Sequence, residues 1–509
     1  MFVRVHTGAI AGIEAVDVTV EVNVAGGGIG LYIVGLPDNT IKESEQRIVA
    51  AFGNSGYHMT AKKIVVNLAP ADLRKEGSLY DLPIAVGILQ ATEQIESKLL
   101  EGSMFIGELS LNGTLRPVKG VLPLVAMARE RGLRRVFLPM ENVAEGAVVD
   151  GIEVIGASSL LELCEMIIGH IPYTAAEHTI CEEEAIGSDD YTEDFADVKG
   201  QAYVKRALEI AAAGGHNIIM IGSPGSGKTM LARRLPTIMP PMTLEEALET
   251  TKIHSVAGKM GAHRGLITSR PFRSPHHLTS QVALIGGGQS PQPGEVSLAN
   301  NGVLFLDEMP EFGRNVLEVL RQPLEDRHIT ISRAKYTVDY PANFTLVASM
   351  NPCPCGYYNH PTKECTCSAA AVHRYKGHIS GPLMDRIDIH VEVVPVSIAE
   401  MSKSGREESS AAVRERVVAA RNIQLERFRD VAIHCNAMMN SAMLRRFAPL
   451  DKACSELLER AMTHLNLSAR AYDRIIKVAR TIADLEGAAD IAPQHISEAI
   501  GYRSLDREN

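Results

Sequence analysis

The stretch Asn217–Thr229 reads NIIMIGSPGSGKT and is the strongest single indication of the fold. Its first part, Asn217–Ile221, is a short apolar run of the kind that forms a buried strand. The next eight residues match the phosphate-loop pattern G-x-x-x-x-G-K-[ST] in full, and the run Met230–Arg234 then begins a helical pattern. The motif requires this order of strand, loop and helix. We therefore expect a nucleotide-binding α/β core built around this stretch.

Each part of this loop has an expected role in holding ATP and Mg²⁺. Glycines let backbone N–H groups close around the phosphates, and the helix N-terminus adds its positive end. We expect Lys228 to reach the outer phosphates and Thr229 to ligate Mg²⁺. The predicted ATP-binding residues are Gly222, Ser223, Pro224, Gly225, Ser226, Gly227, Lys228 and Thr229.

Two further apolar runs end in polar residues that suit ATP hydrolysis. The run Gly302–Leu306 leads into Asp307 and Glu308, which we expect to hold the Mg²⁺ shell and to polarise the attacking water. The run Thr345–Met350 leads into Asn351, whose amide can hydrogen-bond the lytic water or the γ-phosphate. A turn-forming asparagine before proline is the alternative interpretation of the last residue.

Two arginines in the C-terminal half are candidates for contacting the nucleotide. Arg386 lies between carboxylates in the stretch LMDRIDI, where it forms either a surface ion pair or a contact with the γ-phosphate of a neighbouring subunit. Such a contact accelerates phosphoryl transfer by about 10³ to 10⁵ and requires an oligomer. Arg470 falls on a helical stretch, where it either faces solvent or touches the nucleotide.

The chain divides by pattern into four parts. Its 509 residues allow about three domains at roughly 150 residues each. Residues 1–170 alternate strand-like and helical runs, which is typical of an α/β domain. Residues 171–195 are acidic and aperiodic, which indicates a solvated linker. Residues 196–396 hold the nucleotide-binding core, and residues 397–509 are helical in pattern and are expected to close the chain as a bundle.

The composition limits the partners and the compartment that we expect. The formal net charge of -10 argues against a protein that coats nucleic acid with its whole surface, so DNA contacts must be local, for instance in the pore of a ring. Tryptophan is absent, which disfavours broad stacking platforms for single strands. No secretion signal and no run of about 18 apolar residues appears. We expect a cytoplasmic protein without a membrane segment.

With these residues placed, the chain resembles the ComM family of magnesium-chelatase-like AAA+ ATPases over nearly its whole length. The resemblance is carried by the phosphate loop, by the acidic strand end, and by Gly35–Asp38, Asn67–Gly77, Arg273–His277 and Asn351–Gly356. It implies a homo-hexameric ring that uses ATP and Mg²⁺ to translocate on DNA like a helicase. It further implies branch migration during natural transformation and homologous recombination, with recombination proteins as partners.

The resemblance also implies roles for the residues described above. Lys228 and Thr229 correspond to the Walker A motif, and Asp307 and Glu308 correspond to the Walker B motif. Asn351 corresponds to sensor 1, Arg386 to the arginine finger and Arg470 to sensor 2. One alternative is a chelatase-like or MoxR-like motor that remodels a protein partner. Another is a non-catalytic nucleotide switch, in which Glu308 and Arg386 would have no obvious purpose.

A basic hairpin is the predicted DNA contact. Residues 329–338 alternate like two strands joined by a basic tip, and they precede the Asn351 strand, where related helicases carry a pore hairpin. Arg333 and Lys335 are the candidates for phosphate contacts that do not depend on base sequence. A solvated hairpin tip is the alternative. The segment Gly286–Gln289 is either a second pore loop or a flexible connector.

The N-terminal part resembles the proteolytic domain of Lon proteases through the stretch Gly107–Val118. Alignment with that family puts Leu79 at the position of the nucleophilic serine and Leu122 at the position of the lysine base. The two catalytic groups are therefore missing, although Ser78 and Lys119 lie nearby and leave a shifted pair open. We expect this domain to serve assembly or DNA binding rather than peptide hydrolysis.

A cluster of four cysteines follows the Asn351 strand, and its members are Cys353, Cys355, Cys365 and Cys367. In a reducing compartment such a cluster favours metal binding over disulfides. Four thiolates can hold one Zn²⁺ in a structural site. The C-x-C spacing is tighter than the common C-x₂₋₄-C spacing, so two alternatives stay open. His360 or His373 replaces one cysteine as a ligand in the first, and the thiols are free in the second.

Overall fold

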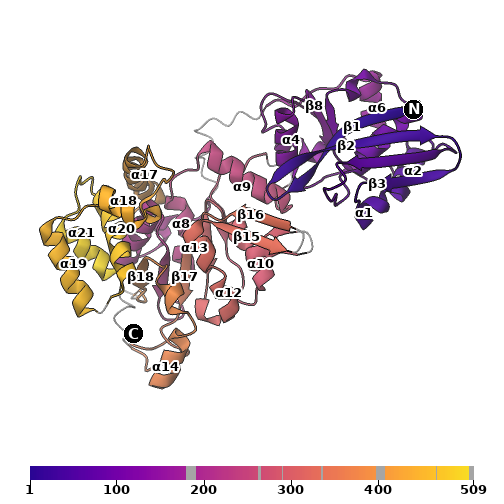
Figure 1. The fold of residues 1–509 in the computed structure, drawn as a ribbon. Coiled ribbons are helices and arrows are strands. Elements are labelled where there is room, and N and C mark those ends of the chain that lie inside the picture. The colour runs from indigo at the N-terminus through magenta and orange to yellow at the C-terminus, as the bar shows by residue number, and fades with distance from the viewer. Residues whose placement is uncertain are drawn as a thin grey trace. The chain divides into compact units, whose positions relative to one another are not determined.

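The computed structural model describes residues 1–178, 191–261, 265–288, 291–333, 336–360, 362–396, 407–465 and 467–503. The chain forms two compact units (Figure 1). The first comprises Met1–Ala185 with Leu244–Ile267, and the second comprises Ile186–Thr243 with Thr268–Asn509. Among the described residues, no helix combines the length and the apolar character needed to cross a bilayer.

The first unit is a mixed sheet with helices packed on it. Its strands are β1 (Phe2–Ala11), β2 (Glu14–Ala25), β3 (Gly30–Val34), β4 (Lys63–Ala69), β5 (Ser103–Phe105), β8 (Arg135–Pro139) and β9 (Glu153–Ala157). Their order in the sheet is β3-β4-β2-β1-β5-β8-β9. A separate small ribbon is formed by β6 (Glu108–Leu109) and β7 (Leu115–Arg116).

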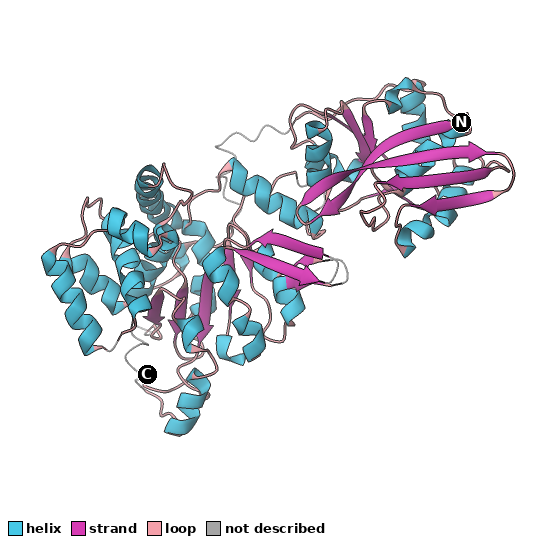
Figure 2. Cartoon of the chain, viewed as in Figure 1, coloured by secondary structure: helices cyan, strands magenta, loops and turns pink. Residues whose placement is uncertain are grey.

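The helices of this unit are α1 (Asn39–Lys42), α2 (Ser44–Asn54), α3 (Asp81–Ala91), α4 (Val121–Glu130), α5 (Val143–Gly146) and α6 (Leu160–Ile168). In β2 the alternation of side chains buries Val18, Val20 and Val22 on one face, and α3 and α4 pack on β1 and β2. The long strands of this sheet are conspicuous in Figure 2. The α/β character predicted for the N-terminal part is confirmed.

Helix α9 (Leu244–Val256) belongs to the first unit, although it falls within residues 196–396 of the predicted core. The N–H of Gly120 donates to the carbonyl of Ser255 at 3.1 Å, and Leu248 packs against the core of the first unit. The sequence pattern did not indicate which core covers this helix. The boundaries at 170, 195 and 396 stay predictions.

The second unit is built on a parallel sheet. Its strands are β10 (Ile218–Ile221), β11 (Phe272–Arg273), β14 (Val303–Leu306), β17 (Thr345–Met350) and β18 (Ile389–Glu392). They lie in the order β11-β14-β17-β10-β18, and every pairing is parallel. All residues of β10, β14 and β17 are buried, as expected for parallel strands covered on both faces. The predicted parallel-sheet core is confirmed.

Short elements surround this sheet. They are α7 (Ala202–Gly214), α8 (Lys228–Ile238), α10 (Gln281–Ile285), β12 (Gly286–Gly287), β13 (Gln292–Pro293), α11 (Glu295–Leu298), α12 (Arg314–Glu318), α13 (Arg321–Asp326), β15 (His328–Arg333), β16 (Tyr336–Pro341), α14 (Ala369–Lys376) and α15 (Gly381–Met384). Strands β15 and β16 form an antiparallel hairpin beside α10 (Figure 1).

The C-terminal region is helical, as predicted. Its helices are α17 (Ser410–Arg427), α18 (Ser441–Phe447), α19 (Lys452–His464), α20 (Ala469–Leu485) and α21 (Pro493–Gly501). Helices α17 and α20 pack on α7, which joins this bundle to the sheet. The apolar side of α20, with Ile475, Val478 and Ile482, is buried in the common core of the second unit.

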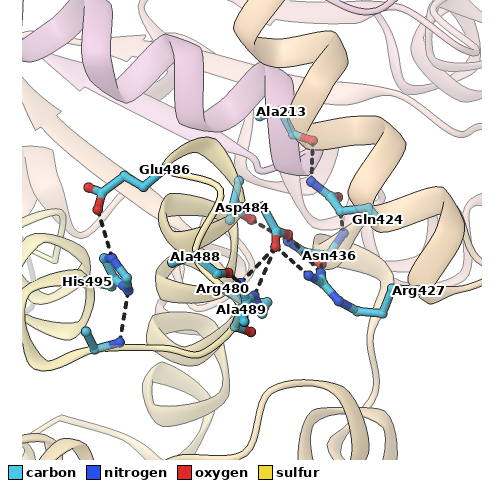
Figure 3. A network of polar contacts seen from close by, with 12 residues as sticks. Ala213, Gln424, Arg427, Asn436, Arg480, Asp484, Glu486, Ala488, Ala489 and His495 are labelled. Atoms are coloured by element: carbon cyan, nitrogen blue, oxygen red, sulfur yellow. Dashed lines mark hydrogen bonds and ion pairs between the residues drawn. The ribbon is translucent and has the colours of Figure 1, made fainter.

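A buried carboxylate organises the polar interior of this bundle. Asp484 is almost inaccessible to solvent, and it accepts hydrogen bonds from Arg427 at 2.8 Å, from Asn436 at 2.8 Å and from Arg480 at 3.1 Å (Figure 3). Gln424 extends the network by donating to the carbonyl of Ala213 in α7 at 3.1 Å. The network therefore connects α17, α20 and α7.

Candidate active site

Three strands of the parallel sheet end at one edge and bring the predicted ATP residues together. Ile221, the last residue of β10, pairs with Met350 of β17, and Leu306 of β14 pairs with Ala348 of β17. The phosphate loop, Asp307 and Asn351 directly follow these three strands. Because ligands of such sheets bind beyond the carboxyl ends of the strands, this edge is the candidate site.

The phosphate loop has the shape and the free donors that phosphates need. Gly225 and Gly227 adopt left-handed backbone conformations with φ of 78° and 92°. A Cβ at Gly222 would collide with the carbonyl oxygen of Val393, so only glycine fits there. Among the described residues, the buried hydroxyls of Ser223 and Ser226 have no hydrogen-bond partner. These orphaned groups fit the oxygens of a bound triphosphate.

Lys228 is the first residue of α8, and its ammonium group lies inside the loop. Its Nζ donates to the carbonyls of Gly222 at 2.7 Å and Ser223 at 3.0 Å, and to Oδ1 of Asn351 at 3.3 Å. Burial lowers the pKa of Lys228, while the carboxylates of Asp307 and Glu308 act in the opposite direction. The predicted lysine and the predicted sensor asparagine are thus in direct contact.

The side chains predicted to hold Mg²⁺ also meet. The Thr229 hydroxyl donates to Oδ2 of Asp307 at 2.8 Å, so both oxygens face one position. Ser349 donates to Oδ1 of Asp307 and accepts from the N–H of Glu308 at 3.1 Å. Sequence reasoning missed Ser349, whose only signal was a hydroxyl within an otherwise apolar strand. The oxygen set suits Mg²⁺, which prefers hard oxygen ligands.

Arg386 and Arg470 belong to a second group, away from Lys228. Arg470 Nη1 lies 3.4 Å from Asp385 Oδ2, which is adjacent to Arg386 in the chain. Asn217, just before β10, donates to the carbonyl of Arg386 at 3.1 Å. The phosphate loop follows the other end of β10, about 15 Å away at roughly 3.3 Å per residue. The structure therefore separates both arginines from the phosphate loop of the same chain.

A buried polar cluster fixes the segment after Arg386. Asp388 accepts from Arg474 of α20 at 2.8 Å and from the backbone of Asn217 at 3.2 Å. His216 lies between Asp388 and Thr481, with ring nitrogens at 3.2 Å and 2.8 Å from them. Burial alone would raise the pKa of Asp388, but the charge of Arg474 and the contact with His216 hold it well below its usual range.

The four clustered cysteines converge on one point. Their sulfur atoms all lie within 4.8 Å of one another. Cys353 Sγ lies 3.3 Å from Cys355 Sγ and 3.6 Å from Cys365 Sγ. A tetrahedral zinc centre with Zn–S of about 2.3 Å places its sulfurs roughly 3.8 Å apart, so the four thiols fit Zn²⁺ without a histidine.

The cysteine loop contacts the phosphate loop. A Cβ placed on Gly356 would lie 2.5 Å from Cδ of Pro224, so this glycine packs directly on the phosphate-loop proline. The backbone N–H of Tyr358 donates to Sγ of Cys353 at 3.3 Å, a contact of the kind that orients thiolate ligands. The cluster is thus attached to the nucleotide site through Pro224 and through the chain from Asn351.

Of the predicted DNA contacts, Lys335 lies outside the described residues, and Arg333 is described only as the last backbone position of β15. Gly286 and Gly287 form β12, which pairs with β13, whereas Gln289 is outside the described residues. The predicted antiparallel hairpin is present, with Thr330 donating to Asp339 at 2.6 Å between its strands.

The four residues compared with the Lon catalytic groups all lie in the first unit. Leu79 and Leu122, at the aligned positions, are buried in its apolar core. The Ser78 hydroxyl donates to Glu108, and the alkyl chain of Lys119 lies against Gly258. The structure therefore places the two nearby polar residues in separate contacts rather than in a catalytic pair.

A parallel sheet of this order, a phosphate loop after β10, paired carboxylates after β14 and an asparagine after β17 define a P-loop ATPase of the AAA+ class. The chain is 44% identical to competence protein ComM of Haemophilus influenzae over 505 residues, 99% of this chain and 97% of the relative. YifB of Salmonella typhimurium is also 44% identical, with the same coverage of both chains. The chain belongs to the ComM/YifB family.

Family models cover most of the chain. The model for magnesium chelatase, subunit ChlI, matches residues 194–401, and the model for the ChlI C-terminal region matches residues 407–503. A further model for subunit ChlI of Mg-chelatase matches residues 20–142. Lon protease 2 of Bacillus subtilis is 27% identical over 135 residues, 26% of this chain and 23% of the relative. The similarity to Lon predicted from the sequence is confirmed.

Proposed function

We propose that this protein is an ATP-driven DNA translocase that acts as a homo-hexameric ring and promotes branch migration. The proposed setting is natural transformation and homologous recombination in the cytoplasm, with recombination proteins as partners. The observation that carries the proposal is the convergence of Lys228, Thr229, Asp307 and Asn351 at one sheet edge, while Arg386 lies at the other. The Haemophilus relative is a competence protein, which supports the proposed setting.

The proposed ring follows from the position of the arginines. A site in which Arg386 and Arg470 take part cannot be completed within one chain, because both lie near the amino end of β10. In a ring, the amino end of one sheet faces the phosphate loop of the next subunit. Arg386 then acts as an arginine finger and Arg470 as sensor 2, and both contact the γ-phosphate held by the neighbour.

In the proposed reaction, the phosphoryl group passes from ATP to water, and Mg²⁺ would supply positive charge beside it. Thr229 and Asp307 would hold the ion, and Lys228 would exchange its carbonyl contacts for the β- and γ-phosphates. Glu308 accepts the proton of the attacking water, which Asn351 positions. Arg386 of the adjacent subunit stabilises the transition state.

DNA is proposed to contact the β15–β16 hairpin in the pore. Arg333 and Lys335 at its tip would bind backbone phosphates, which suits a motor that moves along DNA of any sequence. Local basic contacts of this kind are compatible with the net charge of -10. The alternative, favoured by the match to magnesium chelatase models, is a motor that remodels a protein partner.

The four cysteines are proposed to hold a structural Zn²⁺. Closing the loop around one ion would fix Gly356 against Pro224 and thereby support the phosphate loop. In other four-cysteine zinc sites the metal likewise stabilises the fold of the segment that binds it.

The test of the proposed function is steady-state ATP hydrolysis by the full chain with and without four-way-junction DNA. We expect DNA to stimulate the wild type, Lys228→Ala to abolish hydrolysis, and the double change Arg333→Ala/Lys335→Ala to keep basal turnover and lose stimulation. If DNA neither binds nor stimulates at low salt, the DNA motor is excluded and protein remodelling takes its place. If stimulation survives the double change, the hairpin assignment is wrong.

A further inference from the structure

The arginine finger is held by a carboxylate of its own chain. Arg386 Nη2 lies 2.7 Å from Oε1 of Glu325, and Arg386 Nη1 donates to the carbonyl of Pro382 at 2.6 Å. The Arg386 side chain is only 8% exposed, whereas that of Glu325 is 48% exposed. Within the described part of the chain, Arg386 Nε has no hydrogen-bond partner although it is buried. Solvent thus weakens the ion pair between Arg386 and Glu325, and Nε of Arg386 can still donate to an acceptor.

Glu325 lies close in sequence to the β15–β16 hairpin. It is the penultimate residue of α13, which ends at Asp326, and β15 begins two residues later at His328. Arg327, between these elements, adopts a left-handed conformation with φ of 59°. The α13 helix and β15 are therefore joined through one residue of fixed conformation rather than through a flexible loop.

The base of the hairpin is also fixed to the ATPase sheet. Arg327 donates to the carbonyl of Phe344 at 2.9 Å, just before β17, and its own carbonyl accepts from Ala342 at 2.8 Å. The ring of His328 contacts the Asp326 carbonyl at 2.9 Å. Both sides of the turn between α13 and β15 are therefore held by hydrogen bonds to neighbouring backbone groups.

We propose that Glu325 is a positioning residue that restrains Arg386 until DNA contacts the hairpin. DNA at the tip shifts the end of α13 and loosens the Glu325–Arg386 pair. The guanidinium then engages the γ-phosphate of the neighbouring subunit, for which its planar donors are better matched than for a single half-exposed carboxylate oxygen. This inference rests on the proposed function, because it requires a finger acting between subunits and a hairpin that binds DNA.

The test is the Glu325→Gln variant of the full chain, assayed for ATP hydrolysis with and without four-way-junction DNA. Removing the charge frees Arg386, so we expect the DNA-independent kcat to rise several-fold towards the stimulated wild-type rate while KM for ATP is unchanged. The ratio of stimulated to basal rate then falls. Glu325→Asp retains the charge and is expected to restore most of the DNA dependence.

The matched control is Glu456→Gln, which removes a carboxylate about as exposed as that of Glu325 and 3.4 Å from Arg460 in α19. It is expected to behave as wild type. If Glu325→Gln keeps the wild-type basal rate and the wild-type stimulation while Arg386→Ala is inactive, Glu325 does not restrain Arg386. The proposed function would then stay intact. A fall in kcat with unchanged stimulation would overturn the restraint too. Full activity in Arg386→Ala would instead show that Arg386 is not an arginine finger.

Discussion

Glu308 has a backbone conformation that is unusual for its residue type. Its φ of 51° lies in the left-handed region, which costs a non-glycine residue about 1 to 3 kcal/mol. Hydrogen bonds from its N–H to Ser349 and to Asp307, each 3.1 Å, hold it there. The side chain itself is exposed. The exposed carboxylate therefore belongs to a residue whose backbone is held beside Asp307, at the carboxyl end of β14.

A residue-scale prediction concerns Glu308→Gln. The amide keeps the shape of the side chain but accepts no proton from water, so kcat should fall by about 10² to 10⁴ while ATP still binds. Single-turnover hydrolysis and binding of a fluorescent ATP analogue measure the two effects separately. Lys228→Ala should lose both. Wild-type turnover in Glu308→Gln would show that another group is the base.

At the scale of elements, the C-terminal helical bundle depends on the buried carboxylate of Asp484. Two arginines, Arg427 and Arg480, and the amide of Asn436 converge on it (Figure 3). Neutralising the carboxylate leaves two guanidinium groups buried without their counter-ion. A buried pair broken in this way typically destabilises a protein by about 3 to 5 kcal/mol.

We therefore expect Asp484→Asn to lower the free energy of unfolding of the second unit by about 3 kcal/mol or more. Urea unfolding followed by circular dichroism measures the change. The control is Glu426→Gln, which removes a largely exposed pair with Arg429 and should cost less than about 1 kcal/mol. Equal effects of the two changes would contradict the importance assigned to the network.

The cysteine loop yields a second prediction at this scale. The purified protein should contain one Zn²⁺ per chain, and Cys353→Ser/Cys355→Ser should lose it, as measured by inductively coupled plasma mass spectrometry. Because the loop packs on Pro224, removal of zinc by a chelator should weaken ATP binding. Gly356→Ala is the matched variant, since it retains all four thiols but would place a methyl 2.5 Å from Pro224 Cδ. A metal-free wild type with normal ATP affinity would exclude the zinc site.

At the scale of the whole molecule, the proposed ring requires Arg386 of one subunit to complete the phosphate site of the next. Mixing inactive Lys228→Ala and Arg386→Ala subunits should recover part of the wild-type ATPase rate. In mixed rings, some sites combine an intact phosphate loop with an intact finger. Recovery as a function of mixing ratio is the measurement. No recovery from subunits that co-assemble would mean that both residues serve the same site in one chain.

Much of the fold was predictable because strand runs and the phosphate loop are local signals. The phosphate loop with Thr229, and the residues Asp307 and Asn351, each come after an apolar strand. Parallel strands end at the same edge of a sheet, so the meeting of these residues could be predicted. The pairing of Arg386 with Glu325 was not predictable, because charge pattern does not tell which surface a side chain faces. The hydroxyl of Ser349 was missed for a related reason, since an isolated polar residue in a strand has no periodic signature.

The proposed function requires that ATP hydrolysis at this site moves branched DNA. The most direct measurement follows a fluorescently labelled four-way junction with homologous arms in the presence of wild-type protein, ATP and Mg²⁺. We expect ATP-dependent resolution of the junction into its duplex products, absent with Lys228→Ala and strongly reduced with Arg386→Ala. An intact junction under conditions in which the wild type binds DNA and hydrolyses ATP would contradict it.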